Sequence, residues 1–526
     1  MEQLCINGRR DYHLPEIIRC LQVGKEDWSE KYDLPANIEW IFFSNDEADR
    51  MIAEKLQDKK RNVELKFHAI LLTDLNTLVE AKYIFKIAKP HQVLYDSSQE
   101  VSPFLKEGLH RLLAQTVDVS QPMDVLHDLS TYFFKSQYGH RLVTESVVVQ
   151  PKFLGNVSHR SSCEMRIKAD FGEQFQPVLN YRDTTRIIID EYRKTNLFLE
   201  YTCEGNVELQ FVIETLNMYS GEITKHEVFS QTEMDNMIEY GPIGAHQVVN
   251  FHLFAKGKGT ICIGSLQLRY SRGRYGEFTL GGERLTNQRG HEIISFFDPG
   301  DFQPPLCVYF GGWRSAGGFE GYRMMKNLKK PMMLLEDSAL LGGGFYRGDS
   351  ELEEKVINVI KEKLAFLGFN TDQLILSGMS MGTHGAIYYG AKLHAYGLIL
   401  IKPIIAFEPI IRNYKLKGVG IFPTALDVVR LMEQQTEMKG YQEIDKQFFD
   451  SIAENGIEHT KLAMVYMKNE DYDDTACERL TRYYLSKNQL VLSKGLSGRH
   501  NDGLNEAIFN FQLFYQLFLT KYFQRN

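Results

Sequence analysis

The chain has 526 residues, of which 43% are hydrophobic and 24% are charged. This length exceeds what one hydrophobic core usually serves, so an ordinary globular protein of roughly two or three domains is expected. The formal net charge of −8, with no dense block of Lys and Arg, argues against a nucleic-acid partner.

The N-terminal segment, MEQLCINGRRDYHLPEIIRC, lacks the unbroken apolar core of a signal peptide. The most lipid-like run, residues 396–407, is interrupted by Lys402 and Pro403 and is too short to span a bilayer, so we interpret it as a buried strand. The 7 cysteines form no CxxC pair, and their odd number favours a reducing compartment over a disulfide framework or a zinc site. These features predict a cytoplasmic protein with no metal ion.

Residues 1–145 are predicted to form a small α/β domain. Apolar runs at 38–46, 67–75 and 91–96 alternate with helical patterns, which is typical of a parallel sheet. None of these runs leads into a GxGxxG or GxxxxGK[ST] motif, so a nucleotide site has no support. We interpret this domain as a docking region for partner proteins.

In residues 150–295 apolar side chains recur at every second position, which predicts half-buried strands. The clearest runs are NVELQFVI, VNFHLFAKG and TICIGSLQLRY. In the last run the apolar phase switches at Gly264 and Ser265, as a β-bulge requires. Several such strands predict a central β-sandwich, which serves either as a structural module or as a carbohydrate-binding one.

Residues 300–526 carry the candidate catalytic chemistry. Strands are predicted at 305–310 and 331–338, followed by an amphipathic helix at 351–369. The segment LILSGMSMG then joins a strand to a small-residue helix through Ser380. A strand, a GxSxG motif and a helix in this order are typical of a nucleophile elbow, in which glycines relieve crowding around a strained serine.

A serine nucleophile needs a histidine as its base and a carboxylate that orients this histidine. After Ser380 the sequence has a strand that ends in acidic residues, and then a glycine-bearing loop that holds His500. The residue pattern does not choose among the four carboxylates, which are Glu470, Asp471, Asp473 and Asp474. The other histidines of this region are better explained as surface or packing residues: His384, His394 and His459.

An oxyanion hole requires backbone N–H groups aimed at the charge that develops on the acyl oxygen. Met381, the residue after the nucleophile, supplies the first of these groups. The glycine-rich loop FGGWR supplies the second, through Gly312 or Trp313, unless this loop is only a tight turn. Phe310 stands where the HGGG motif of lipases has a histidine, so the exact donor stays open.

Four segments together resemble one bacterial family: YFGGWRSAGGFEGY, SGMSMGTHGAIYYGAKL, VYMKNEDYD and SGRHNDGLN. Over essentially its whole length the chain is similar to the second accessory secretory protein of the accessory Sec system, which exports serine-rich-repeat adhesins. The resemblance implies a cytoplasmic, α/β-hydrolase-like O-acetyltransferase that acetylates N-acetylglucosamine on the adhesin glycoprotein. It also implies a role in export that is separate from catalysis.

The resemblance further implies site residues and partners. The family's serine, glutamate and histidine match Ser380, Glu470 and His500, which selects Glu470 from the four carboxylates and gives a Ser-His-Glu acyl-enzyme mechanism. The implied partners are the first and third accessory secretory proteins, the accessory SecA motor at the membrane translocase, and the adhesin. No tightly bound cofactor is expected, and acetyl-CoA is one candidate for the unidentified acetyl donor.

Two alternatives stay open at this point. Hydrolases and transferases share this machinery, so the chain is also compatible with a carbohydrate esterase. A non-catalytic export adaptor with a vestigial triad is the second alternative. The expected fold is an α/β protein with an N-terminal α/β domain, a central β-sandwich and a C-terminal α/β-hydrolase-like domain.

Overall fold

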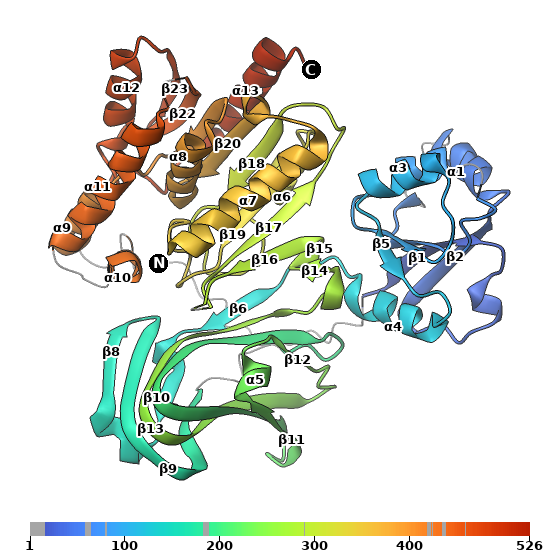
Figure 1. Cartoon of the computed structure of the whole chain (residues 1–526), viewed down its shortest axis with the longest axis horizontal. Coiled ribbons are helices and arrows are strands. Elements are labelled where there is room, and N and C mark those ends of the chain that lie inside the picture. Colours follow the sequence, from blue (N-terminus) through green and yellow to red (C-terminus); the bar gives the residue numbers. More distant parts are fainter. Residues whose placement is uncertain are drawn as a thin grey trace. The chain divides into compact units, whose positions relative to one another are not determined.

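The computed structural model describes residues 16–57, 65–78, 81–181, 189–288, 290–417, 422, 424–433, 438–457 and 459–525. The chain is a mixed α/β protein with several sheets, and it divides into two compact units (Figure 1). Unit 1 comprises Met1–Ser136 with Arg272–Gly281, and unit 2 comprises Gln137–Ser271 with Gly282–Asn526. The division into three domains at residues 145 and 295 stays a prediction.

Unit 1 is built on a five-stranded parallel sheet with the order β2-β1-β3-β4-β5. Its elements are β1 (Ile18–Gly24), β2 (Ile38–Ser44), α1 (Ala48–Gln57), β3 (Ala69–Leu72), α2 (Lys82–Ile87), β4 (Val93–Asp96), α3 (Pro103–Arg111), β5 (Gln115–Val117) and α4 (Pro122–Tyr132). The three runs predicted as strands are confirmed as β2, β3 and β4. Alternating helices and parallel strands bury apolar side chains on both faces of the sheet.

A short later segment, residues 272–281, also belongs to unit 1 and carries β14 (Gly276–Glu277) and β15 (Thr279–Leu280). The guanidinium group of Arg272 donates hydrogen bonds to the carbonyl oxygens of Tyr132 at 3.0 Å and Ser136 at 2.8 Å. It also lies over the ring of Phe134, 3.6 Å from the ring centroid. These contacts explain why the unit is discontinuous in sequence.

The predicted β-sandwich requires a correction, because its strands form one hydrogen-bonded antiparallel sheet of eight strands. Three of the strands are 18, 23 and 24 residues long, and they curve together in Figure 1. The elements are β6 (Gly139–Leu142), β7 (Val147–Val149), β8 (Val157–Ser161), β9 (Glu164–Tyr181), β10 (Thr195–Asn217), β11 (Ile223–Ser230), α5 (Gln231–Met234), β12 (Ile238–Tyr240) and β13 (Gln247–Tyr270).

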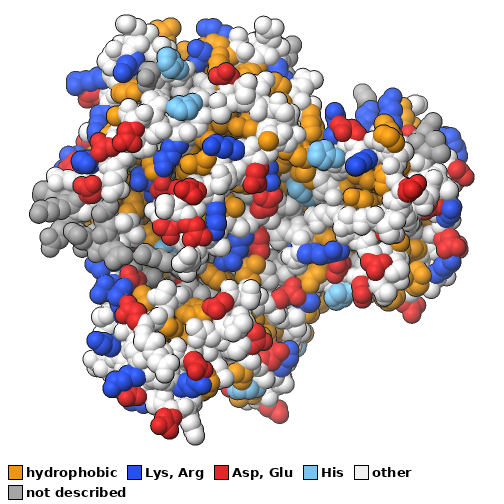
Figure 2. Space-filling model, in the orientation of Figure 1, with side chains coloured by type: hydrophobic (Ala, Val, Ile, Leu, Met, Phe, Trp, Pro, Cys, Tyr) orange, Lys and Arg blue, Asp and Glu red, His pale blue; other side chains and the backbone are white. Residues whose placement is uncertain are grey.

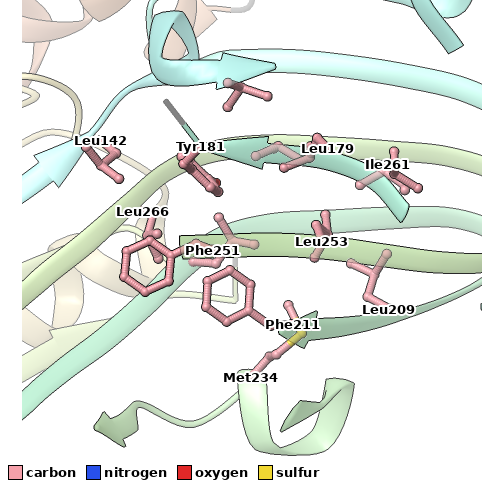
Figure 3. Close-up of a cluster of buried hydrophobic side chains, with 14 of the residues drawn as sticks. Leu142, Leu179, Tyr181, Leu209, Phe211, Met234, Phe251, Leu253, Ile261 and Leu266 are labelled. Carbon is pink, nitrogen blue, oxygen red and sulfur yellow. The ribbon is translucent and has the colours of Figure 1, made fainter. Parts of the chain in front are cut away.

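Glycines in the middle of the long strands allow this curvature. Gly205 in β10 and Gly257 in β13 both have φ of +89°. A Cβ atom on Gly257 would lie 1.8 Å from the carbonyl oxygen of Asn206, so only glycine fits this corner. The bent sheet encloses one buried apolar cluster, and Figure 3 shows Met234 of α5 beside Phe211 in it.

The alternation predicted for this region agrees with the burial of its side chains. The predicted inward positions of β10 and β13 are buried throughout. The predicted β-bulge is also confirmed, because the strand register shifts between Leu199 and Tyr201, where Gly264 and Ser265 lie opposite Glu200. The extra residue switches the buried face from one phase of β13 to the other.

Glu200 at this bulge gives a pH-dependent prediction. Its carboxyl group accepts hydrogen bonds from Ser265 N–H at 3.2 Å and Gln267 Nε2 at 2.6 Å, and burial raises its pKa from 4.5 to about 7. The folded state therefore binds this proton more tightly than the unfolded state does. Proton binding adds up to about 3 kcal/mol to the free energy of unfolding, and this contribution is lost as pH rises from about 4.5 through about 7.

We expect the melting temperature of the wild-type protein to fall more between about pH 5 and about pH 8 than that of Glu200→Gln. Thermal denaturation of the two proteins side by side measures the difference. Equal falls in both proteins would show that Glu200 does not take up a proton on folding.

The third large sheet has eight strands in the order β16-β17-β19-β18-β20-β21-β22-β23. β17 is antiparallel to both of its neighbours, and the pairs from β19 to β23 are parallel. The strands are β16 (Gly282–Thr286), β17 (Glu292–Asp298), β18 (Leu306–Phe310), β19 (Met332–Asp337), β20 (Leu374–Met379), β21 (Gly397–Ile401), β22 (Lys461–Met467) and β23 (Val491–Leu496). The helices are α6 (Tyr322–Lys326), α7 (Ser350–Leu367), α8 (Met381–Leu393), α9 (Phe407–Lys417), α10 (Ala425–Glu433), α11 (Met438–Asn455), α12 (Ala476–Ser486) and α13 (Leu504–Phe523).

The predicted strands at 305–310 and 331–338 are confirmed as β18 and β19, and the predicted amphipathic helix is α7. Parallel pairing brings the carboxyl ends of β18, β20, β22 and β23 to the same edge of the sheet. The candidate site residues lie in the loops that leave this edge: Gly312, Ser380, Glu470 and His500.

Within the described ranges, the helices are either too short or too polar to cross a membrane. Figure 2 shows acidic and basic side chains interspersed over the visible face, with no extended basic patch on it.

Candidate active site

Ser380 lies at a sharp turn between β20 and α8, with φ of +52° and ψ of −119°. This backbone conformation is strained for a residue that carries a Cβ atom. The flanking glycines make the turn sterically feasible: a Cβ on Gly378 would lie 2.4 Å from the backbone of Gly382, and one on Gly382 would lie 2.0 Å from Phe310 O. Ser380 N–H donates to Ile401 O at 2.8 Å, which anchors the turn to β21.

The structure brings Ser380, His500 and Glu470 into one hydrogen-bonded chain. Ser380 Oγ lies 2.8 Å from His500 Nε2, and His500 Nδ1 lies 2.8 Å from Glu470 Oε1. The imidazole is buried, whereas the other two residues are half-buried. In the tautomer that carries its proton on Nδ1, the ring donates to the carboxylate and can accept the serine proton at Nε2.

The four clustered carboxylates differ in what they accept. Glu470 Oε1 accepts from the imidazole, whereas Asp471 Oδ1 accepts from the backbone N–H of His500 at 3.0 Å. Asp473 Oδ2 accepts from two backbone N–H groups that precede α9, and Asp474 pairs with an arginine on the surface. Glu470 is therefore the member of the cluster that contacts the imidazole ring.

Two further side chains hold His500 in place. The ring of Tyr472 stacks on the imidazole, with centroids 4.2 Å apart and an angle of 11° between the planes. Lys402 Nζ donates to the carbonyl oxygens of His500 at 2.5 Å and Asp502 at 2.8 Å, and burial lowers the pKa of its ammonium group. Sequence patterns do not mark either role, although a lysine inside the apolar run 396–407 was an available signal.

The N–H group of Met381 has the position expected of an oxyanion donor. Met381 is the first residue of α8. The first N–H groups of a helix have no acceptor within the helix, and the helix dipole there favours a negative charge. A tetrahedral oxyanion formed at Ser380 would therefore lie close to a favourable donor.

The second predicted donor, Gly312, is already engaged. Its N–H group donates to Glu320 Oε2 at 2.5 Å, so it is not available to an oxyanion in this conformation. The N–H group of Trp313, the alternative that the sequence left open, has no acceptor among the described residues. The Trp313 amide is accordingly the one of the two that stays available, because the Glu320 side chain from the far end of the same loop occupies Gly312.

The other histidines have different surroundings. His384 is fully buried and stacks on Phe448, with ring centroids 4.1 Å apart, and burial lowers its pKa well below the usual range. It is a packing residue, as predicted. His394 ends α8 and His459 precedes β22, and both are exposed.

Other candidate binding features lie away from the triad. In the part of the chain that the structure describes, His, Cys, Asp and Glu side chains form no group of three that could hold a metal ion. A cavity of about 410 Å³ lies between the curved sheet and α10, with Arg160, Glu200 and Arg430 among its lining residues. None of the triad residues lines it, and carbohydrate binding by residues 150–295 stays a prediction.

Comparisons with known proteins relate the whole chain to one family. The family model described as the accessory Sec system GspB-transporter matches residues 18–525. The chain is 34% identical to the second accessory Sec system protein of Streptococcus gordonii, covering 97% of this chain and 99% of that one. It is 30% identical to the counterpart from Staphylococcus aureus, covering 97% and 98%. A chain of the glycosylation-associated protein (Gap123) complex from Streptococcus agalactiae matches with a TM-score of 0.91 and 35% identity, over 97% of this chain and 100% of that chain.

Proposed function

This chain belongs to the accessory Sec system GspB-transporter family, and on that premise we propose that it acts in adhesin export as an O-acetyltransferase. Its proposed substrate is N-acetylglucosamine on a serine-rich-repeat glycoprotein. The observation that carries the catalytic part is the hydrogen-bonded chain from Ser380 through His500 to Glu470 at a strained turn. A vestigial site would have no need to keep this strain and these contacts together.

We assign the chemistry to an α/β-hydrolase-like domain that spans residues 300–526. Two features support this assignment. The serine follows β20 directly, as in a strand–turn–helix nucleophile elbow. The glutamate and the histidine follow β22 and β23, so the chain order is Ser, Glu, His, which is the order of α/β-hydrolases.

In the first half of the proposed reaction, Ser380 Oγ attacks the carbonyl carbon of an acetyl donor while His500 Nε2 takes the hydroxyl proton. Glu470 stabilises the resulting imidazolium. The N–H groups of Met381 and Trp313 donate hydrogen bonds to the oxyanion. When the tetrahedral intermediate collapses, the leaving group departs with the proton from His500, and an acetyl ester stays on Ser380.

In the second half, a sugar hydroxyl attacks the acetyl ester and gives its proton to His500. Ser380 Oγ leaves and recovers that proton, so the enzyme returns to its starting state. The same triad would also transfer the acetyl group to water, which is why a carbohydrate esterase is the alternative activity. The proposal includes no tightly bound cofactor, and acetyl-CoA is one candidate donor.

We propose that the other accessory secretory proteins are the partners of this chain. The matched Streptococcus agalactiae chain comes from a complex, which supports assembly with related proteins. Unit 1 and the curved sheet are the proposed docking regions, because neither carries the triad. From the family resemblance we also propose that the chain acts with the accessory SecA motor and the adhesin, at the membrane translocase.

The decisive experiment is mass spectrometry of the adhesin glycans from cells that carry Ser380→Ala. A transferase predicts that acetyl groups disappear while the adhesin is still exported. A gain of acetyl groups would instead indicate an esterase, and unchanged glycans would indicate an adaptor. Wild-type cells and cells carrying Ser377→Ala provide the reference and the matched control.

A further inference from the structure

The loop that follows β18, residues 311–321, closes on itself through one carboxyl group. Glu320 Oε2 accepts hydrogen bonds from Gly312 N–H at 2.5 Å and from Tyr309 Oη at 3.1 Å. Tyr309 is 1% exposed within β18, so these contacts tie both the sheet and the start of the loop to the same carboxyl group. The loop is thereby held where it leaves the sheet.

This part of the loop also contacts the nucleophile elbow. A Cβ atom on Gly312 would lie 3.2 Å from Glu320 Oε2 and 3.1 Å from the carbonyl oxygen of Met379, the residue before Ser380. The backbone of Gly312 is therefore held between the carboxyl group and the end of β20. A change in how Glu320 holds the loop would move backbone that lies directly beside the elbow.

The amides on either side of Trp313 are both occupied. Gly312 N–H donates to Glu320, and Arg314 N–H donates to the carbonyl oxygen of Gly342 at 3.3 Å. The indole Nε1 of Trp313 donates to Thr424 Oγ1 at 3.2 Å, which holds the side chain as well. The Trp313 amide is thus held in orientation from both sides while it has no acceptor among the described residues.

We propose, on the premise of the acyl-transfer function above, that Glu320 is the positioning residue of the oxyanion hole. By holding the Gly312 amide, it leaves the Trp313 amide directed toward the acyl oxygen. Glu320 itself does not touch the substrate in this role. Its contribution reaches the reaction through the backbone of the loop.

The role requires the reach of the Glu320 side chain rather than its charge. Burial raises the pKa of Glu320, and it raises the pKa of the nearby Glu336 well above its usual range. Tyr309, Arg314 and Tyr346 are further titratable groups that interact with Glu320. A carboxylate beside a developing oxyanion would oppose it. Glutamine keeps an oxygen acceptor at the same distance without this charge, whereas aspartate keeps the charge but is one methylene shorter.

The test uses the full-length protein with p-nitrophenyl acetate as the acetyl donor. We expect Glu320→Ala and Glu320→Asp to lower kcat by about 10²-fold, the usual effect of losing one oxyanion donor, with KM nearly unchanged. Glu320→Gln should keep kcat within about threefold of the wild type, because it restores the acceptor. Glu351→Ala, which removes a half-exposed partner of Lys355 on α7, is the matched control.

The outcomes separate this inference from the proposed function. If Glu320→Asp turns over like Glu351→Ala, or if Glu320→Gln loses as much as Glu320→Asp, the positioning role is wrong. Melting temperatures show whether Glu320→Ala folds. If this variant does not fold, the comparison of kcat between Glu320→Gln and Glu320→Asp still tests the positioning role. If wild type and Ser380→Ala turn over equally, the acyl-transfer function fails and the inference fails with it.

Discussion

We expect Ser380→Ala to abolish both acetyl transfer and labelling by a fluorophosphonate probe, while the protein stays folded. The expected loss in kcat is roughly 10⁶-fold, because the substitution removes the oxygen that forms the acyl-enzyme. The hydroxyl is half-buried and bonds to His500, so its removal leaves the backbone of the turn intact. His500→Ala should abolish transfer for the same reason, since Oγ then has no base.

Ser377→Ala is the matched control for this result. Ser377 lies in β20, the strand that leads to Ser380, and its buried hydroxyl donates to Val308 O at 3.0 Å and accepts from Tyr515 Oη at 2.7 Å. Its removal should lower the melting temperature, because it leaves buried groups unpaired, but labelling of Ser380 should persist. Labelling that survives Ser380→Ala would place the nucleophile at another residue.

We expect Glu470→Gln to lower kcat by about 10²-fold and Glu470→Ala to lower it by about 10⁴-fold. Glu470 Oε1 accepts from His500 Nδ1 and from the backbone N–H groups of Asp471 and Tyr472. The amide oxygen of glutamine can keep these bonds, so the tautomer is preserved and only the charge that stabilises the imidazolium is lost. Alanine removes the acceptor as well, which frees the ring to take the wrong tautomer.

The neighbouring carboxylates provide the controls for Glu470. Asp471→Asn keeps an oxygen that can accept from His500 N–H, and Asp474→Asn changes only a surface ion pair. Asp473→Asn disturbs the buried cap before α9 and should lower the melting temperature more than it lowers kcat. Transfer rates of Glu470→Gln and of the three aspartate-to-asparagine variants show whether Glu470 alone serves the histidine. Equal losses in all four would indicate a general charge effect.

The parts of the site that are local in sequence could be predicted. β20, Ser380 and α8 lie within residues 374–393, and the glycines that the turn needs are in the same segment. The pairing with His500 spans 120 residues and depends on how the sheet brings β20 and β23 to one edge. For this reason the order of Ser, acid and His was predictable from residues, whereas the choice of Glu470 needed either a family resemblance or the coordinates.

Motifs and apolar periodicity do not predict several other features of the structure. The engagement of Gly312 by Glu320 is a contact between two loop residues, and no motif encodes it. The sequence pattern does not predict β1, because Gln22 interrupts its apolar run. Gln22 is nevertheless buried, because its amide donates to Thr73 Oγ1 and Glu26 O and accepts from Trp28 N–H. The alternation predicts a sandwich rather than a curved sheet, because it reports which side chains face inward and says nothing of where a strand bends.

The return of residues 272–281 to unit 1 sets the order in which the protein can mature during synthesis. Tyr275 is 1% exposed, and its hydroxyl donates to Asp128 Oδ2 at 2.6 Å, so the earlier part of unit 1 lacks a core side chain until this segment leaves the ribosome. All strands of the curved sheet emerge before then. Unit 1 therefore receives its last segment only after about half of the polypeptide has been translated, and a nascent chain arrested before residue 272 would expose the rings of Tyr132 and Phe133 that Tyr275 contacts.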